Sequence, residues 1–338
     1  MRAYEVRETD PDYEGVVRAE RDRPTPAADE ACVRIRACSL NYRDLAIASS
    51  ELVYPGVDLP VVPLSDGAGE IVEVGDDVTA VGEGDRVATP FAPDWLDGES
   101  TPAKVARSTG GNLDGALTEY AAFPAESLTT LPEHLSYEQG ATLPCAGLTA
   151  WRALAEDGDL GAGESVLALG TGGVSTFALQ FAKLHGSTAV VTSSSDEKLD
   201  RARELGADET INYEETPEWG SVVGEELGGV DHVVEVGGPN TLEQSLQAAA
   251  HGGHVHLIGV LAGSAGEVNP SLILGKALDV EGVIGVGSAA MADRMTKAIE
   301  ATGMEPVVDR VFDFDEAREA YRYAEAGRHR GNVVVSVD

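Results

Sequence analysis

Short runs of alternating apolar and polar residues, separated by Gly and Pro, fill the first 125 or so residues of the chain. The clearest runs are 30–40, 67–75, 84–90 and 117–124. Short strands at this spacing are typical of a β-barrel-like domain. Residues 92–115 are polar and Gly-rich, so we predict a long loop there.

The pattern changes near residue 135, where strands begin to alternate with helices. Residues 136–156 predict helical segments interrupted by Pro144 and Gly147. The strands that follow are predicted at 165–170, 188–193, 231–236, 253–260 and 279–286, and the helices at 174–186, 195–206, 240–250 and 289–303. This alternation predicts an α/β fold with a doubly wound parallel sheet and right-handed crossovers.

Two domains follow from these patterns. The first comprises residues 1–130 and is completed by 303–338, because the run 331–338 predicts a strand that returns to it. The second, a dinucleotide-binding domain, comprises residues 131–302. No apolar run reaches the roughly 18 residues of a membrane span, and the N-terminus lacks an apolar signal region. We therefore expect a cytoplasmic protein without membrane contacts.

The composition is strongly acidic, with 58 Asp and Glu, 24 Lys and Arg, and a net charge of -34. Only five of the basic residues are lysines. Phosphate contacts need basic patches, so nucleic-acid binding is not expected. Self-repulsion of this charge would destabilise a compact fold in dilute buffer, and salt would screen it. The pattern is similar to proteins of salt-accumulating, halophilic archaea; an ordinary acidic protein is the alternative.

The turn "GTGGVS" at 170–175 lies between a buried strand and a helix with an apolar face, as in a dinucleotide-binding site. Gly170 permits the tight turn, and Gly172 lets the backbone approach a pyrophosphate at the helix N-terminus. The third position needs a small residue, and Ser175 is only slightly larger than Gly. Gly173 and Val174 complete the predicted site.

The second strand of the predicted sheet ends in Ser193, Ser194 and Ser195. An NAD enzyme would usually place an acid here to bind the ribose 2′-hydroxyl. Hydroxyl donors and Lys198 suit a 2′-phosphate, so we expect NADP. Asp196 and Glu197 favour the alternative, NAD, unless they lie in the first turn of the next helix. The serines also suit a helix N-cap, and Ser195 is expected to serve both roles.

Five motifs together resemble the medium-chain dehydrogenase/reductases: "SLNYRDLAI", "PLSDGAGEIVEVG", "GDRVATP", "LPCAGLTAW" and "GTGGVSTFALQFAK". The resemblance covers nearly the whole chain and is greatest to the zinc-free quinone oxidoreductases and their alcohol-dehydrogenase-like relatives. It implies a GroES-like β-barrel catalytic domain beside a Rossmann domain, and an NAD(P)-dependent oxidoreductase acting on a small molecule.

The same resemblance implies that catalytic zinc has been lost. Zinc-dependent members hold the metal with Cys, His and Cys, and these positions fall on Asn41, Ser65 and Cys145 here. Neutral Asn and Ser are poor zinc ligands. The lobe that holds a structural zinc in relatives corresponds to 92–115, which contains no cysteine. We therefore predict no metal site.

Cys145 has several interpretations. It is one of three cysteines, with Cys32 and Cys38, and no C-x-x-C spacing occurs, so neither a disulfide framework nor a cysteine zinc finger is expected. We favour a thiol that lines the pocket or is packed in the core over a partial metal ligand or a reactive nucleophile. No His lies near it in sequence.

Without zinc, hydrogen-bond donors must polarise the substrate carbonyl. The resemblance places Asn41, Tyr42, Tyr54 and Ser65 around the vacated position, where either tyrosine could supply a proton. Asp66 is a candidate relay or a turn cap. Packing or a surface position is the alternative for each tyrosine.

Further cofactor contacts are implied by the resemblance or by position after parallel strands, where ligands bind. The family likeness places Thr149 near the nicotinamide and Tyr213 near the adenosine phosphate. The turns after later strands should line the nicotinamide half; their residues are Val236, Gly237, Ile258, Gly259, Val260, Val286 and Gly287. His251, His254 and His256 form a second candidate cluster, for which core packing is favoured over metal binding.

Carbonyl–alcohol interconversion, quinone reduction and enone reduction all fit these residues. A non-catalytic NADP-binding redox sensor is the alternative from a different functional class.

The run 278–288 is predicted as the last strand, and the resemblance places it at the sheet edge. An exposed apolar edge favours pairing with a second chain. We expect a homodimer or a homotetramer, and a loop at 260–275 that covers the edge is the competing possibility.

Overall fold

The computed structural model describes residues 1–49, 56–261, 263, 265–284 and 286–337. Its contacts define two compact units, residues 1–148 with 285–338 (unit 1) and residues 149–284 (unit 2). These boundaries lie inside the segment that the sequence assigned to the second domain. The difference arises because helix α9 (Ala289–Thr302) packs on β7 (Thr129–Thr130), and α2 (Tyr137–Gly140) packs on β3 (Glu30–Leu40).

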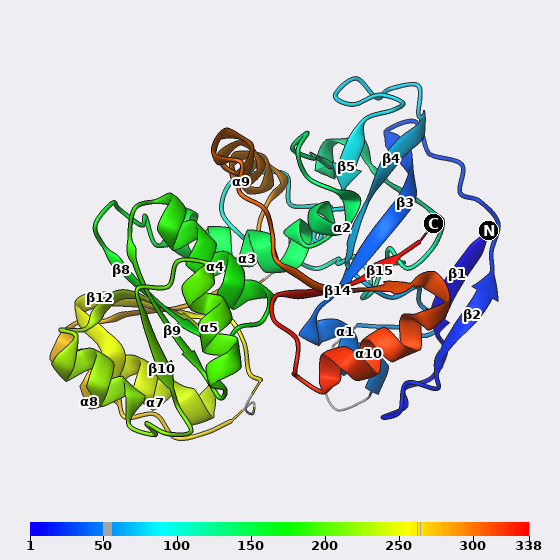
Figure 1. The fold of residues 1–338 in the computed structure, drawn as a ribbon. Coiled ribbons are helices and arrows are strands. Elements are labelled where there is room, and N and C mark those ends of the chain that lie inside the picture. The colour runs from blue at the N-terminus through cyan, green and yellow to red at the C-terminus, as the bar shows by residue number, and fades with distance from the viewer. Residues whose placement is uncertain (50–55, 262, 264, 285, 338) are drawn as a thin grey trace. The chain divides into compact units, whose positions relative to one another are not determined.

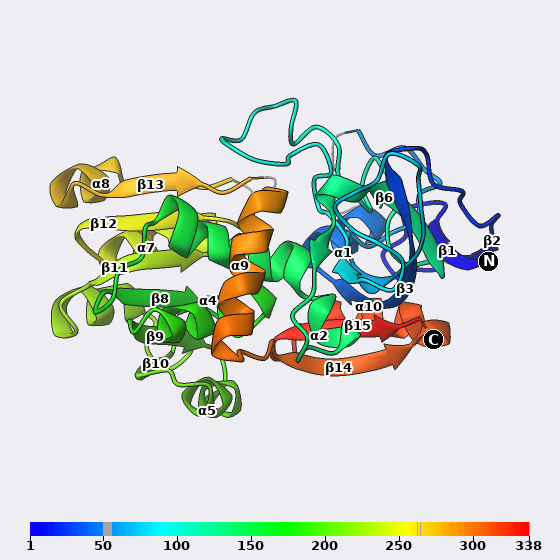
Figure 2. The same cartoon turned by 90° about the horizontal axis from the view of Figure 1, so that it is seen from above.

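Unit 2 is built on a six-stranded parallel sheet in the order β10-β9-β8-β11-β12-β13. Figure 2 shows these strands side by side, with β13 at one edge. The strands are β8 (Ser165–Leu169), β9 (Thr188–Ser193), β10 (Glu209–Asn212), β11 (Val230–Glu235), β12 (Ala249–Leu257) and β13 (Asp279–Gly282). This is the strand order of the doubly wound dinucleotide-binding fold, as the sequence predicted.

Helices α4 (Gly173–Leu184), α5 (Asp196–Glu204), α7 (Pro239–Ala248) and α8 (Pro270–Lys276) pack against the strands of unit 2 (Figure 1). Further helical segments are α3 (Leu148–Trp151), η3 (Arg152–Asp157), α6 (Trp219–Ser221) and η4 (Val222–Glu226). The α4 helix buries Phe177 and Phe181, which lie four residues apart and so share one face of the helix. The α7 helix ends where Lys276 Nζ donates to the carbonyls of Leu246, Gln247 and Ala249.

Unit 1 is centred on β3, which pairs antiparallel with β4 (Asp66–Val74), β6 (Tyr120–Pro124) and β15 (Asn332–Ser336). The sheet continues to β14 (Val308–Asp313) on one side and to β5 (Arg86–Ala88) and β7 on the other. A hairpin of β1 (Arg2–Val6) and β2 (Val16–Glu20) stands beside it. The return of the last strand to this unit confirms the sequence prediction.

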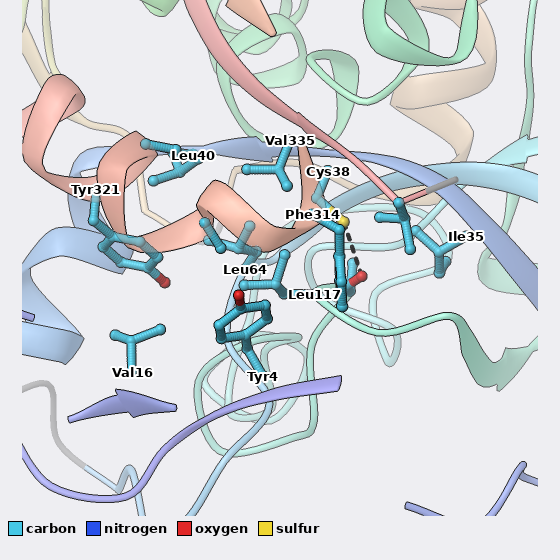
Figure 3. Close-up of a cluster of buried hydrophobic side chains, with 14 of the residues drawn as sticks. Tyr4, Val16, Ile35, Cys38, Leu40, Leu64, Leu117, Phe314, Tyr321 and Val335 are labelled. Atoms are coloured by element: carbon cyan, nitrogen blue, oxygen red, sulfur yellow. Dashed lines mark hydrogen bonds between the residues drawn. The ribbon is translucent and has the colours of Figure 1, made fainter. Parts of the chain in front are cut away.

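The core of unit 1 gathers side chains from segments distant in sequence (Figure 3). Tyr4, Ile35, Leu117 and Tyr321 are all at most 3% exposed. The Cys38 thiol lies among them and donates to the Ala116 carbonyl at 2.8 Å, the contact dashed in the figure.

Several elements were not predicted from the sequence. They are the β1–β2 hairpin, β10, β14, α1 (Tyr42–Ser49), α8 and α10 (Ala317–Glu325). The α1 helix lacks an amphipathic pattern because every residue after Tyr42 is buried. Strand β13 ends at Gly282, earlier than the predicted 286. Residues 92–115 form an extended loop, as predicted, anchored by the buried Trp95.

Candidate functional site

A wholly buried carboxylate, Asp66, begins strand β4 and links two segments of unit 1. Its Oδ1 accepts a hydrogen bond from Ser65 Oγ at 2.6 Å, and its Oδ2 accepts one from the Cys145 amide at 2.9 Å. Cys145 lies in the π-helical turn η2 (Leu143–Gly147) and is partly exposed. The structure therefore brings Ser65, Asp66 and Cys145 together in one hydrogen-bonded group.

A second buried carboxylate, Asp44, lies in α1 close to this group. Its Oδ2 accepts from the Asn41 amide at 2.8 Å, and its exposed fraction is 1%. Burial raises the pKa of Asp44 to about 6, opposed by the neighbouring Arg43 charge. Burial also raises the pKa of Asp66 to about 7, opposed by the Ser65 hydrogen bond and reinforced by the Asp44 charge. Unit 1 thus holds two carboxyl groups that titrate near neutral pH.

Arg43 is a buried cation that sequence reasoning missed. Its guanidinium lies 4.6 Å from the centre of the Phe91 ring and donates to the Thr109 carbonyl at 2.7 Å and to Ser108 Oγ at 2.9 Å. These contacts fasten the 92–115 loop to α1. The sequence did carry a signal for it, because Arg43 stands beside the apolar run of residues 45–48.

The remaining predicted residues of unit 1 differ in their surroundings. Tyr42 is 41% exposed and is available to a ligand, whereas Tyr54 lies outside the described residues. Val286 has a left-handed backbone with φ of 65°, and Gly287 packs so closely on Leu148 that a Cβ there would lie 2.8 Å from it.

A small hollow of about 20 Å³, open on one side to solvent, lies within unit 1. It opens beside Thr89, whose Oγ1 donates to the Ser65 carbonyl at 3.0 Å. Its lining is mainly apolar and includes Ala88, Phe91, Leu143, Pro144, Leu148 and Met295.

In unit 2 the β8–α4 turn has the geometry of an anion site. Gly170 adopts a φ of 77°, which favours glycine, and Gly172 is the N-cap of α4 without a side-chain cap. A Cβ at either position would meet no atom within 4 Å, so space is open above the turn. Ser175 is buried and donates to the Leu169 carbonyl at 2.6 Å, which ties helix to strand. Gly173 and Val174 begin α4.

The three serines at the end of β9 have different surroundings. Ser193 is buried at the strand end and Ser194 is exposed. Ser195 is the N-cap of α5 and accepts from the Lys198 amide at 3.4 Å. Tyr213, 37% exposed, donates its amide to the Ser193 carbonyl at 3.0 Å, so the β9 and β10 ends lie together.

The turns after β11 and β12 are also joined. The Glu235 carbonyl accepts from the amides of Ile258 at 2.8 Å and Gly259 at 3.2 Å. A Cβ at Gly259 would lie 2.4 Å from the Val236 carbonyl oxygen, so the two backbones touch. Gly237 is buried in the first turn, Val260 is 38% exposed in the second, and Thr149 is buried in α3.

His254 and His256 stack with a third residue, His232 of β11, that was not predicted. His232 Nδ1 lies 3.2 Å from His256 Nε2, and His232 Nε2 lies 3.3 Å from Glu164 Oε2. His251 is exposed and stands apart on β12. Burial lowers the pKa of His232 and lowers that of His256 to about 3. Among the described residues, no group of three His, Cys, Asp or Glu could hold a metal ion.

No helix within the described ranges is long and apolar enough to cross a membrane.

The chain matches two family profiles. Residues 27–133 match the "Alcohol dehydrogenase GroES-like domain" and residues 173–316 match the "Zinc-binding dehydrogenase" family. The first covers strands β3 to β7 of unit 1, and the second begins at the first residue of α4.

Three known proteins are similar over most of their length. A zinc-type alcohol dehydrogenase-like protein of Schizosaccharomyces pombe is 45% identical over 91% of both chains. A quinone oxidoreductase of Mus musculus is 30% identical over 88% of this chain and 86% of its own. A solved structure of an NAD-dependent alcohol dehydrogenase is 30% identical, covers 100% of both chains and superposes with a TM-score of 0.90. This chain is therefore an oxidoreductase that belongs to the medium-chain dehydrogenase/reductase superfamily.

Proposed function

We propose that the protein is an NADP-dependent, zinc-independent oxidoreductase that transfers hydride between nicotinamide and a small carbonyl compound, alcohol or quinone. The observation that carries this proposal is the Ser65–Asp66–Cys145 group, in which hydrogen bonds join the segments that a catalytic zinc would otherwise join. Enone reduction at the same site is the rival within this class.

The residues at the zinc positions do not fit the metal. Zinc takes thiolate, imidazole or carboxylate ligands, three of them from the protein in catalytic sites. Asn41 and Ser65 offer neutral groups, and Ser65 Oγ is already bonded to Asp66. Cys145 alone retains a ligand atom of the right kind. Elemental analysis after dialysis should find well under one zinc per chain; about one retained zinc would refute this part.

The β8–α4 turn fits a dinucleotide pyrophosphate, because open amides at the α4 N-terminus favour an anion. Ser194 and the exposed side of Tyr213 are suited to the adenosine 2′-phosphate. When bound, the nicotinamide supplies the hydride. An acid that would bind a free 2′-hydroxyl is absent from 193–195, which supports NADP.

The carboxyl groups of unit 1 can manage the proton that accompanies the hydride. With a pKa raised to about 7, Asp66 holds a proton on a fraction of molecules at neutral pH. Its Oδ1 accepts from Ser65 Oγ at 2.6 Å, so this hydroxyl is the group with which Asp66 exchanges a proton. Tyr42, exposed at the start of α1, is the alternative donor.

Nucleotide oxidation with a panel of aldehydes, quinones and enones, measured at high KCl with NADPH and NADH, tests the activity. NADPH should bind more tightly than NADH, and Ser194→Asp should reverse the preference, because a carboxylate repels the 2′-phosphate. Equal or tighter NADH binding by the wild type would contradict the cofactor assignment. Nucleotide binding without turnover of any substrate class would favour a redox sensor.

We also propose that the chain forms a homodimer, or a dimer of dimers, through β13. This strand is the sheet edge, and Ile284 just beyond it is 69% exposed. Arg152 fixes this end of the strand by donating to the Ile284 carbonyl at 2.7 Å. An unpaired sheet edge, with an exposed apolar residue just beyond it, favours pairing with a second copy.

A further inference from the structure

Glu235, the last residue of β11, carries a wholly buried carboxylate. Its Oε1 accepts from the amides of Gly237 at 2.7 Å and Gly238 at 2.8 Å, and from Thr241 Oγ1 at 2.7 Å. Its Oε2 accepts from Ser245 Oγ. A carboxylate is an acceptor only, so four donors satisfy it without a cation.

These donors belong to the N-terminus of α7. Gly238 is the N-cap of that helix, Gly237 precedes it, and Thr241 and Ser245 lie on its first turns. A helix N-terminus attracts negative charge. In unit 2, therefore, the α7 N-terminus holds the protein's own carboxylate, whereas the α4 N-terminus lacks a side-chain cap and has open space above Gly172.

The main chain of Glu235 also binds the turn that follows β12. Its carbonyl accepts the amides of Ile258 and Gly259, which follow β12. Gly238 has a φ of 85°, and a Cβ added there would lie 3.0 Å from Val260 Cα. Because the backbones of 236–238 and 258–260 touch, displacement of one turn must displace the other.

We propose that Glu235 is a positioning residue for the nicotinamide half of the bound dinucleotide. Both turns follow the carboxyl ends of parallel strands, where ligands of this fold bind. Glu235 does not contact the ligand itself; it holds the main chain of 236–238 and 258–260 in the shape that the nicotinamide meets. This inference rests on the proposed function, because it requires a nicotinamide dinucleotide in unit 2.

The test compares a whole dinucleotide with its adenosine half. Binding of NADPH and of 2′-phospho-ADP-ribose, and likewise of NADH and ADP-ribose, is measured by calorimetry for wild type and Glu235→Gln. In Glu235→Gln a donor NH2 group replaces one of the two carboxylate oxygens. The four hydrogen bonds that Glu235 accepts therefore cannot all form. We expect Kd to rise about tenfold for the dinucleotide and less than about twofold for the half ligand, because a turn that is no longer pre-organised loses affinity.

Asp231→Asn is the matched control. Asp231 lies at the opposite end of the same strand, and its Oδ2 accepts from the Ser165 amide at 2.8 Å and from Ser165 Oγ at 2.7 Å. It should lower stability without changing the ratio of the two Kd values. Thr241→Val, which removes one donor to the same carboxylate, gives a milder variant should Glu235→Gln fail to fold.

An equal loss of both affinities in Glu235→Gln, or no loss in Glu235→Gln and Thr241→Val, would overturn the positioning role. Failure of the wild type to bind any of the four ligands would refute the proposed function, and the inference with it. A raised Kd for the dinucleotide alone supports both.

Discussion

Acid should lower the free energy of unfolding of unit 2 through His256, a residue of β12 whose side chain is buried. The residue is 1% exposed, and its Nε2 lies 3.2 Å from His232 Nδ1. Since His232 Nε2 faces Glu164, neutral His232 donates there and accepts from His256. Burial, and after it the charges of His232 and His254, lower the pKa of His256 from 6.5 to about 3.

The sign and size follow from proton linkage. Below pH 6.5 the unfolded chain binds a proton at His256 that the folded chain does not, so stability falls on acidification until the folded pKa is reached. Each pH unit in that window costs about 1.4 kcal/mol per group, so His256 alone should cost roughly 2 kcal/mol between pH 7 and pH 5. The raised pKa values of Asp44 and Asp66 mean that acid stabilises the folded state through these two groups. This opposite effect is the same in every variant compared, so it cancels.

Comparison of variants isolates this contribution. His256→Gln keeps a donor toward His232 and removes the titrating ring, while His251→Gln removes an exposed imidazole from the same strand. Urea unfolding at pH 7 and pH 5, in fixed KCl, should show about 2 kcal/mol less acid destabilisation for His256→Gln than for wild type or His251→Gln. An identical loss in all three proteins would refute the assignment of a neutral, buried His256.

Four further results are expected. Buried Asp66 should cost stability as pH rises from its unfolded pKa of 3.8 to about 7, so the Tm of wild type relative to that of Asp66→Asn should fall over this range; a constant difference between the two Tm curves would contradict it. Lys276→Met should lower the free energy of unfolding by about 1–3 kcal/mol, since three carbonyls at the end of α7 lose their donor, with exposed Lys297→Met as control. Ile284→Lys should convert a dimer to monomers in light scattering at high salt; a mutant that remains dimeric excludes this edge. Tm should rise between dilute buffer and about 2 M KCl, because the net charge is -34, and an unchanged Tm removes salt adaptation.

The sequence predicted those features whose cause is local. The β8–α4 turn was found because Gly170 and Gly172 are needed where the backbone turns and a ligand approaches. The edge position of β13 was also predicted correctly, but from the family resemblance and not from a local pattern. Ser195 was expected as a cap and is one.

Features that depend on contacts between distant segments were missed. Arg43, Glu235 and His232 are buried polar residues whose partners lie elsewhere in the chain, apart from the nearby amides and hydroxyls that Glu235 gathers. Helix α1 gave no periodic signal because it is buried on all sides. The domain boundaries moved because α2 and α9 pack on strands of unit 1, which no local pattern reveals.

The interruption of unit 1 by unit 2 constrains the order in which the chain can mature during synthesis. Strand β15 pairs with β3 across almost the full length of the chain, so the barrel sheet stays incomplete while unit 2 emerges from the ribosome. Unit 2 is continuous and has its own core, so it can fold first. Until β15 arrives, the side of β3 that it will cover is an unpaired strand edge. A nascent chain arrested before residue 332 would therefore expose an aggregation-prone surface that the finished protein conceals.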